Sequence, residues 1–325
     1  MNGMQADRIR LDYGRAAGTD LLANLSGAAF DNGYLWTVSD EGRTIECLKA
    51  QGDGFVLLQQ LHIDAIIAGL PGAEDGAQGA ELDLESIDIA HGALWLCGSH
   101  CNVQKTPEGA NALNAKIRPR PSRHFLACIN IKKDGYSLGK ARLAPIEGPR
   151  ALRRVLAGDS YLGPFIDLPS KENGLDIEGI AVVADEVLLG LRGPILDNRA
   201  VVVHLKLDSD LEVKSYRLSF LDLGGLAIRD LSRRDDALLV IAGPVGDADG
   251  PFRLYRWVPE IMSEAGVVKI QRPDEIYAWP PGTEKPEGLS YLERNGKPGH
   301  LFVYDRPDPA RIHRGVYEAD WWPIV

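Results

Sequence analysis

The chain has 325 residues, of which 45% are hydrophobic and 7% aromatic, and its formal net charge is −10. This composition is typical of a folded core and excludes a disordered or collagen-like chain. The acidic balance, without a block of Lys and Arg, argues against nucleic acid as the main partner.

Membrane and secretion signals are missing from the sequence as well. The first residues, MNGMQADRIRLDYG, contain no apolar signal core, and no run approaches the length of a membrane span. The four cysteines form no dense framework of the kind that disulfide-rich secreted domains need. We therefore expect a cytoplasmic protein with reduced thiols and no membrane partner.

The first predicted element, residues 8–13 (RIRLDY), is a short alternating strand. It is similar to residues 215–220 (SYRLSF), which end a later unit of the chain. Near the other terminus, the last unit has only one strand candidate, residues 315–321, after residues 302–304. We predict that residues 8–13 complete this last unit, so that the two ends of the chain close a ring without a free sheet edge.

Two units of four strands are predicted next. The first spans residues 25–63 and the second begins at residue 81. The second unit contains a polar, proline-bearing insertion at about 103–123. It is followed by a second insertion at about 145–172, where Leu152, Val155 and Leu156 have the spacing of a short helix. The outer strands of these two units are expected at residues 44–48, 55–61, 125–131 and 139–144.

The third unit shows the pattern most clearly, in residues 172–207 (ENGLDIEGIAVVADEVLLGLRGPILDNRAVVVHLKL). Short runs of β-branched and aliphatic residues, bounded by turn residues, indicate strands in an antiparallel meander. Asp176 and Glu178 stand at the start of its first strand, and Arg192 stands at the end of its second. In a meander these two points lie at the same edge of the sheet.

The spacing of this meander recurs along the chain. From Glu178, the residue fourteen positions on is Arg192. The same step leads from Glu85 to Ser99, from Arg229 to Gly243 and from Ser26 to Asp40, while the copy that starts at Glu287 has a turn four residues longer and ends at Asp305.

Five copies of one spacing predict a repeat protein, and their separations of 51 to 93 residues suit four-stranded blades that carry loops. We interpret residues 1–325 as a single β-propeller domain with five blades, six being the alternative.

Charged residues are predicted to converge at one mouth of the propeller, because the first strand of each blade lines the channel and the second runs back beside it. One ring would contain Ser26, Glu85, Glu178, Arg229 and Glu287, and a second ring would contain Asp40, Ser99, Arg192, Gly243 and Asp305. His100 and Arg306 would lie one residue further along, and Asp83 and Asp176 two residues before their glutamates.

Crowded carboxylates repel one another unless cations intervene. A Ca²⁺ or Mg²⁺ ion would resolve the repulsion here, because both take oxygen ligands and leave positions for water or substrate. The candidate ligands are Glu85, Glu178, Glu287, Asp40 and Asp305. The arginines could instead pair with the glutamates, or hold a phosphate or carboxylate of a ligand.

The motifs GLDIEGIA, GLRGPILDNRA and PEGLSYL carry a resemblance to a known family. They resemble an uncharacterised bacterial family of β-propeller proteins that is catalogued only as a domain of unknown function. More distantly, the chain is similar to propellers with Glu-Gly-Leu or Glu-Gly-Ile channel motifs, which include the phytase esterase-like domains. Arg229 departs from this pattern, because it stands where a glutamate would be expected.

Two functional hypotheses follow from the mouth. In the first, a divalent-metal-dependent hydrolase acts on a small anionic ester, such as a phosphoester or a lactone. Its candidate catalytic residues are Glu85, Glu178, Glu287, Arg192, Arg229 and His100. In the second, the propeller is not an enzyme and binds a small ligand or a protein partner. Ordered geometry at the mouth separates the two, since an enzyme needs an open cleft with convergent reactive groups.

Overall fold

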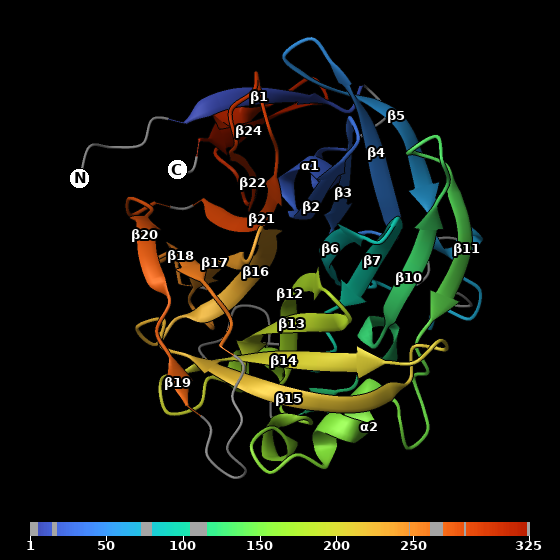
Figure 1. The fold of residues 1–325 in the computed structure, drawn as a ribbon, viewed down its shortest axis with the longest axis vertical. Helices are drawn as coiled ribbons and strands as arrows, with labels where there is room; N and C mark the ends of the chain where they lie inside the picture. Colours follow the sequence, from blue (N-terminus) through green and yellow to red (C-terminus); the bar gives the residue numbers. More distant parts are fainter. Residues whose placement is uncertain are drawn as a thin grey trace.

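The computed structural model describes residues 6–14, 18–72, 80–104, 116–246, 248–260, 269–282 and 284–323. The described residues are folded mainly into strands that form antiparallel sheets arranged around a central axis (Figure 1). The β-propeller predicted from the repeats is confirmed.

The first three units of four strands follow one another along the chain. Sheet one contains β2 (Leu25–Asp31), β3 (Tyr34–Ser39), β4 (Thr44–Gln51) and β5 (Gly54–His62). Sheet two contains β6 (Leu84–Ala90), β7 (Ala93–Gly98), β10 (Leu126–Ile131) and β11 (Leu138–Leu143). Sheet three contains β12 (Asp176–Val183), β13 (Glu186–Gly193), β14 (Ala200–Leu207) and β15 (Val213–Leu221).

Two further four-stranded units complete the ring. Sheet four contains β16 (Ala227–Arg234), β17 (Ala237–Gly243), β18 (Arg253–Trp257) and β20 (Asp274–Ala278). The last unit contains β21 (Lys285–Tyr291), β22 (His300–Asp305), β24 (Val316–Trp322) and β1 (Asp7–Asp12).

The N-terminal strand closes the last unit, as the sequence predicts. β1 pairs antiparallel with β24 in the register Asp7↔Trp321 to Asp12↔Val316. It also meets β5 of sheet one in parallel, with Leu11 opposite Phe55. The side chain of Leu11 is fully buried, so the first and last sheets share a core at this seam. The N- and C-terminal ends of the chain accordingly lie on the same side of the ring in Figure 1.

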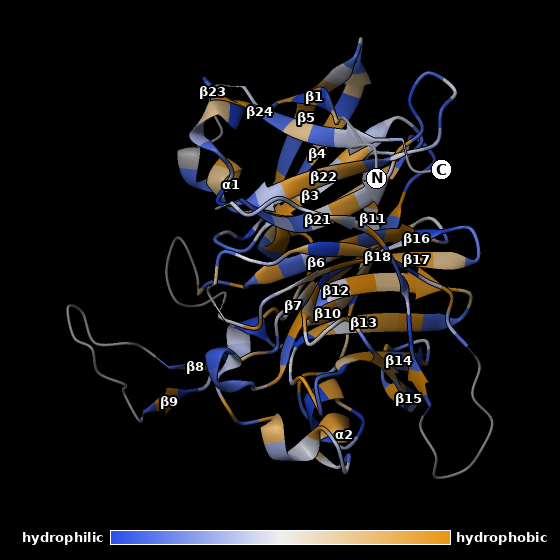
Figure 2. Cartoon of the chain, turned by 90° about the vertical axis from the view of Figure 1, so that its left-hand side faces the viewer, coloured by the Kyte–Doolittle hydropathy of each residue, from blue (hydrophilic) through white to orange (hydrophobic). Residues whose placement is uncertain are grey.

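Short elements occupy the connections between the main strands. The helices are α1 (Thr19–Ala23) and α2 (Leu152–Ala157), with the 3₁₀ turns η1 (Ile63–Ala65), η2 (Pro121–Arg123), η3 (Gly163–Phe165), η4 (Ser170–Glu172) and η5 (Pro309–Arg311). The two-residue strands are β8 (Val103–Gln104), β9 (Ile117–Arg118), β19 (Ile270–Gln271) and β23 (Ile312–His313). β8 and β9 pair with each other and stand out from the ring (Figure 2). Among the described residues, no helix is long and apolar enough to cross a membrane.

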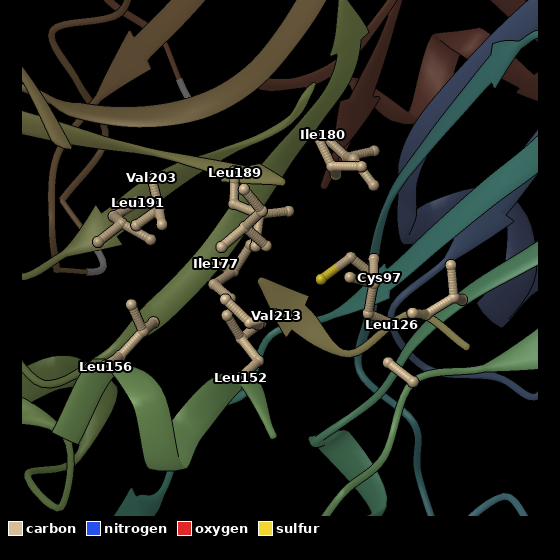
Figure 3. Packing of buried hydrophobic residues seen from close by; sticks show 14 of the residues in the cluster. Cys97, Leu126, Leu152, Leu156, Ile177, Ile180, Leu189, Leu191, Val203 and Val213 are labelled. Atoms are coloured by element: carbon tan, nitrogen blue, oxygen red, sulfur yellow. The ribbon is translucent and has the colours of Figure 1, made fainter. Parts of the chain in front are cut away.

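The apolar faces of neighbouring sheets pack against each other and form the core. Helix α2 joins this core where the Leu152–Val155–Leu156 spacing predicts a helix, and its Leu152 and Leu156 are buried on the side of sheet three (Figure 3). All four cysteines are free and buried, which agrees with the expectation of reduced thiols.

Candidate functional site

The same irregularity occurs in the innermost strand of each sheet. In β2, β6, β12, β16 and β21 the register shifts by one residue close to the start of the strand. Such a bulge leaves one residue without a partner across the ladder and redirects its side chain, and bulges are frequent next to active sites. The five residues at these bulges are Ser26, Glu85, Glu178, Arg229 and Glu287. The first predicted ring is therefore a ring of bulges.

A cavity of about 240 Å³, which we call the mouth cavity, lies at this end of the inner strands. The second strand of each sheet ends beside it, as the pairing of Lys285 with Asp305 shows. From the two predicted rings, the structure brings Asp40, Glu85, Glu178, Arg192, Arg229, Glu287 and Asp305 into its wall. Asp83, Asp176 and Arg306 also line it.

Arg229 is the central cation of this wall. Its Nε lies 2.8 Å from Oε2 of Glu178, an ion pair without the alignment of a hydrogen bond, and its Nη2 donates to Oε1 of Glu287. All three side chains are nearly fully buried. The guanidinium therefore neutralises two bulge carboxylates at once, in the place where the repeat pattern would put a further glutamate.

Arg192 completes this network from the end of β13. Its Nη1 donates to Oε1 of Glu178 at 2.7 Å, and its Nε donates to the carbonyl oxygen of Val245 at 2.7 Å. Asp176 lies 3.9 Å from the same guanidinium. These contacts are those of a structural partner of Glu178, which is one of the two roles that the sequence leaves open for this arginine.

Two carboxylates of the wall are held differently. The structure gives Asp40 and Glu85 no hydrogen bond or ion pair to any described residue, and Oδ1 of Asp40 is buried. Burial, with a smaller contribution from Asp305, raises the pKa of Asp40 to about 7. Burial and the nearby Asp83 raise the pKa of Glu85 well above its usual range. Asp40 can therefore carry a proton close to neutral pH, and Glu85 holds its proton more readily than a glutamic acid in water.

Asp83 and Asp176 flank the bulge glutamates and each accepts a hydrogen bond, while Oδ1 of Asp176 is buried without a hydrogen-bond partner among the described residues. Arg123 Nη1 lies 2.6 Å from Oδ2 of Asp83 and 3.0 Å from Sγ of Cys101. The Ser170 hydroxyl donates to Oδ2 of Asp176. Burial still raises the pKa of Asp176 to about 6, so this carboxyl holds its proton more readily than an aspartic acid in water.

The remaining predicted positions lie outside the cavity wall. His100 packs instead against His124, with ring centroids 5.9 Å apart, and its Nε2 contacts the carbonyl oxygen of Phe125 at 3.1 Å. Burial lowers the pKa of His100 to about 3, so the ring is neutral. The hydroxyl of Ser26 donates to the carbonyl oxygen of Leu84 at 2.6 Å. The structure therefore does not place His100 with the other candidate catalytic residues, because its ring is buried between His124 and the backbone of Phe125.

Several residues of the cavity are not among the sequence-based candidates. Lys285 stands two positions before Glu287, the same offset as Asp83 from Glu85, so the repeat rule could have found it. Arg123 comes from the insertion in sheet two, where no repeat applies. Asn102 and Cys101 follow the second strand of that sheet, and their position also depends on the insertion.

The predicted metal ligands are only partly available for a cation. Within the described part of the chain, no three His, Cys, Asp or Glu side chains form a ready metal-binding cluster. Glu178 and Glu287 are engaged by arginine, which leaves Asp40, Glu85 and Asp305 of the five candidates. The metal stays a prediction.

Comparison with known families gives a match over most of the chain. Residues 24–317 match the family described as "protein of unknown function (DUF3616)". No match is found among curated proteins.

Solved structures resemble the chain in fold. An exo-β-1,3-galactanase from Clostridium thermocellum aligns with a TM-score of 0.50 and 10% identity over 98% of this chain, which spans 62% of the galactanase chain. Glutaminyl cyclase from Myxococcus xanthus aligns with a TM-score of 0.46 and 8% identity over 100% of both chains. The PQQ-bound aldose sugar dehydrogenase from Streptomyces coelicolor aligns with a TM-score of 0.38 and 11% identity over 98% of this chain and 100% of its own. At 10% identity the likeness to the galactanase extends to the fold and no further.

Proposed function

We propose a function for a protein that belongs to the DUF3616 family, and we take the chemistry of the mouth cavity as its basis. We infer that the cavity binds a small polar molecule and hydrolyses it by acid–base chemistry. The observation that carries this proposal is the pair Asp40 and Glu85, two partly buried carboxylates that have no ion pair in the described structure. Perturbed carboxylates in a concave polar site are typical of catalytic acids and bases.

Asp40 is the candidate for proton transfer. A general acid or base works best when its pKa lies near the working pH, and the pKa of Asp40 is about 7. In the unprotonated form it would take a proton from the attacking water. In the protonated form it would give a proton to the leaving group. Glu85, on the inner strand β6 of the neighbouring sheet, would position the water or share the proton.

Arg306 suggests where an anionic group of a substrate would be held. Its side chain is 67% exposed at the rim, and Asp305 lies 3.9 Å from it. A guanidinium at an open rim can hold a phosphate or a carboxylate. We therefore retain a small anionic ester, either a phosphoester or a lactone that carries a carboxylate, as the substrate class. The resemblance to phytase esterase-like propellers, predicted from the sequence motifs, stays part of this proposal.

A divalent cation stays part of the proposal, but fewer residues are available to bind it than the sequence suggests, because arginines engage Glu178 and Glu287. Asp40, Glu85 and Asp305 are the predicted ligands outside the arginine network, and the buried, unpartnered Oδ1 of Asp40 fits such a role, although these three side chains do not form a ready cluster in the described structure. When bound, the cation would supply polarisation of the scissile bond.

A hydrolysis screen tests this function. Wild type is offered phosphoesters and lactones with and without Ca²⁺ or Mg²⁺, beside Asp40→Asn and the surface control Asp210→Asn. We expect at least one substrate to be hydrolysed, with activity lost in Asp40→Asn and retained in Asp210→Asn. Equal activity in both variants would remove Asp40 from the mechanism.

Non-catalytic binding is the second candidate, and the Glu178–Arg229–Glu287 network favours it, because paired carboxylates are unsuited to catalysis. It predicts ligand binding without turnover. A ligand that shifts the melting temperature, is not hydrolysed, and binds Asp40→Asn as well as wild type would support this alternative.

A further inference from the structure

A second cavity, of about 280 Å³, lies at the opposite end of the inner strands. We call it the far cavity. It is lined where β2, β16 and β21 end, by residues that include Phe30, Ile89, Ser232, Arg233, Arg234 and Tyr291. The mouth cavity lies where the same strands begin, and the two cavities have no lining residue in common.

The inner strands approach one another closely between the two cavities. A Cβ on Gly288 would lie 3.0 Å from Cα of Gly27, and a Cβ on Gly179 would lie 3.0 Å from the backbone nitrogen of Leu231. These glycines follow directly after the bulge residues, where neighbouring strands come into contact. A ligand in the far cavity would therefore be distinct from one in the mouth cavity.

Hydrogen bonds between sheets hold the wall of the far cavity in place. Oδ2 of Asp88 accepts from the backbone N–H of Val182 at 2.7 Å. The hydroxyl of Ser290 accepts from the backbone N–H of Phe30 at 2.8 Å. Each bond joins a side chain of one sheet to the inner strand of the next. The cavity is thus preformed, which lowers the entropic cost of binding.

The charges at the far cavity are unequally satisfied. Asp88 accepts from two backbone N–H groups, those of Val182 and Ile89, so its carboxylate is occupied. The side chain of Asp235 is 86% exposed at the turn. Burial raises the pKa of Asp88, whereas Arg233 lies close enough to lower it, and Arg233 donates one hydrogen bond at 3.1 Å, to the carbonyl oxygen of Val182. Most of its N–H donors remain for a ligand within the described part of the chain.

Apolar side chains form the smaller part of the wall and limit the shape of that ligand. Phe30 and Ile89 line the same cavity as Arg233, and Tyr291, 37% exposed, contributes an aromatic ring with a hydroxyl group. The volume lies near the lower end of small-molecule sites. We propose that the far cavity binds a small molecule with one oxyanion, a carboxylate or a phosphate, held by Arg233, and a short apolar or aromatic body.

Isothermal titration calorimetry with inorganic phosphate, butyrate and phenyl phosphate tests this proposal on the full chain. We expect butyrate or phenyl phosphate to bind, and Arg233→Gln to weaken that binding at least about tenfold. Arg272→Gln is the matched control, because Arg272 is 83% exposed and remote from the lining of the far cavity. Preference for butyrate or for phenyl phosphate identifies the carboxylate or the phosphate source.

Two further variants separate this site from the mouth cavity and guard against misfolding. Ser232→Phe fills the far cavity without changing an arginine, and it should also abolish binding. Asp40→Asn changes the mouth cavity and should leave the far cavity's binding unaltered. Absence of binding by wild type, or equal affinity in wild type, Arg233→Gln and Ser232→Phe, overturns the proposal. Binding lost in Asp40→Asn but kept in Arg233→Gln assigns the ligand to the mouth cavity and overturns it too.

Discussion

The two sides of the mouth cavity are built from the same backbone feature but differ in their electrostatics. On the side of sheets three to five, Glu178 and Glu287 share Arg229 and are nearly fully buried. On the side of sheets one and two, Asp40 and Glu85 are partly buried and have no ion pair to a described residue. We call these the paired side and the open side.

This difference shows that one arginine in place of a repeated glutamate can give two sides of the same cavity different electrostatics. A bulge presents a side chain at every inner strand, and an arginine at the fourth bulge neutralises the carboxylates on either side of it. The bulge carboxylate that forms no ion pair with Arg229 is Glu85. Burial raises the pKa of this carboxyl well above its usual range. The paired side therefore supports the ring, and the open side is left for chemistry.

The largest effect should come from removing the cation of the paired side. Arg229→Met leaves Glu178 and Glu287 buried with less compensation, and breaking a buried pair costs roughly 3–5 kcal/mol. Urea unfolding of the variant should show a loss of this order. Arg272→Met, an exposed arginine, should change stability by far less. A loss below about 1 kcal/mol would mean that Arg229 does not sustain the paired side.

The backbone of this site could be predicted well from the sequence, because the repeat spacing fixes which residues begin an inner strand. Glu85, Glu178 and Glu287 share a wall of one cavity, as the spacing implies. His100 lies outside this wall because its ring stacks on His124, which follows an insertion that only sheet two carries.

Pairing between side chains is a different kind of information, and spacing alone does not contain it. The sequence leaves open whether Arg192 binds a ligand or Glu178, since both need the same position. Arg123 reaches the cavity from an insertion that only one sheet carries. Such contacts depend on how loops fold back over the ring, and no copy elsewhere in the chain reports on them.

Metal titration compares the two sides directly. If a divalent cation binds on the open side, saturation at about 100 times its Kd adds roughly 2.7 kcal/mol of stability. Thermal unfolding of demetallated protein with added Ca²⁺ or Mg²⁺ should show an increase in Tm that Glu85→Gln abolishes. Glu178→Gln, on the paired side, should retain the increase. The reverse result would place the cation on the paired side.

Arg192, at the edge of the paired side, tests how strongly Glu178 depends on its arginine partners. Its loss leaves Glu178 with Arg229 alone, and an incompletely satisfied buried group costs roughly 1–3 kcal/mol. We therefore expect Arg192→Ala to reduce the free energy of unfolding by that amount. The loss should shrink when Glu178→Gln is added, as a double-mutant cycle in urea would measure. Additive losses would show that Arg192 acts independently of Glu178.

The smallest effect is the pH dependence that Asp40 gives to folding. Burial raises its pKa from 3.8 to about 7 in the folded protein, so between these values the folded state holds a proton that the unfolded chain releases. Stability therefore falls as pH rises through this window, and the whole penalty is present above about pH 7. Asp40→Asn lacks the penalty.

The unfolding free energy of Asp40→Asn relative to wild type should thus increase from about pH 4 to about pH 7 and then level off. Because Asp40 is partly exposed, solvent screens this penalty, and we expect a change on the order of 1 kcal/mol. Asp210→Asn, at an exposed turn residue, is the control measured over the same range. Parallel curves for wild type and Asp40→Asn would mean that folding does not raise the pKa of Asp40. Asp40 would then not be able to act as the proton donor at neutral pH.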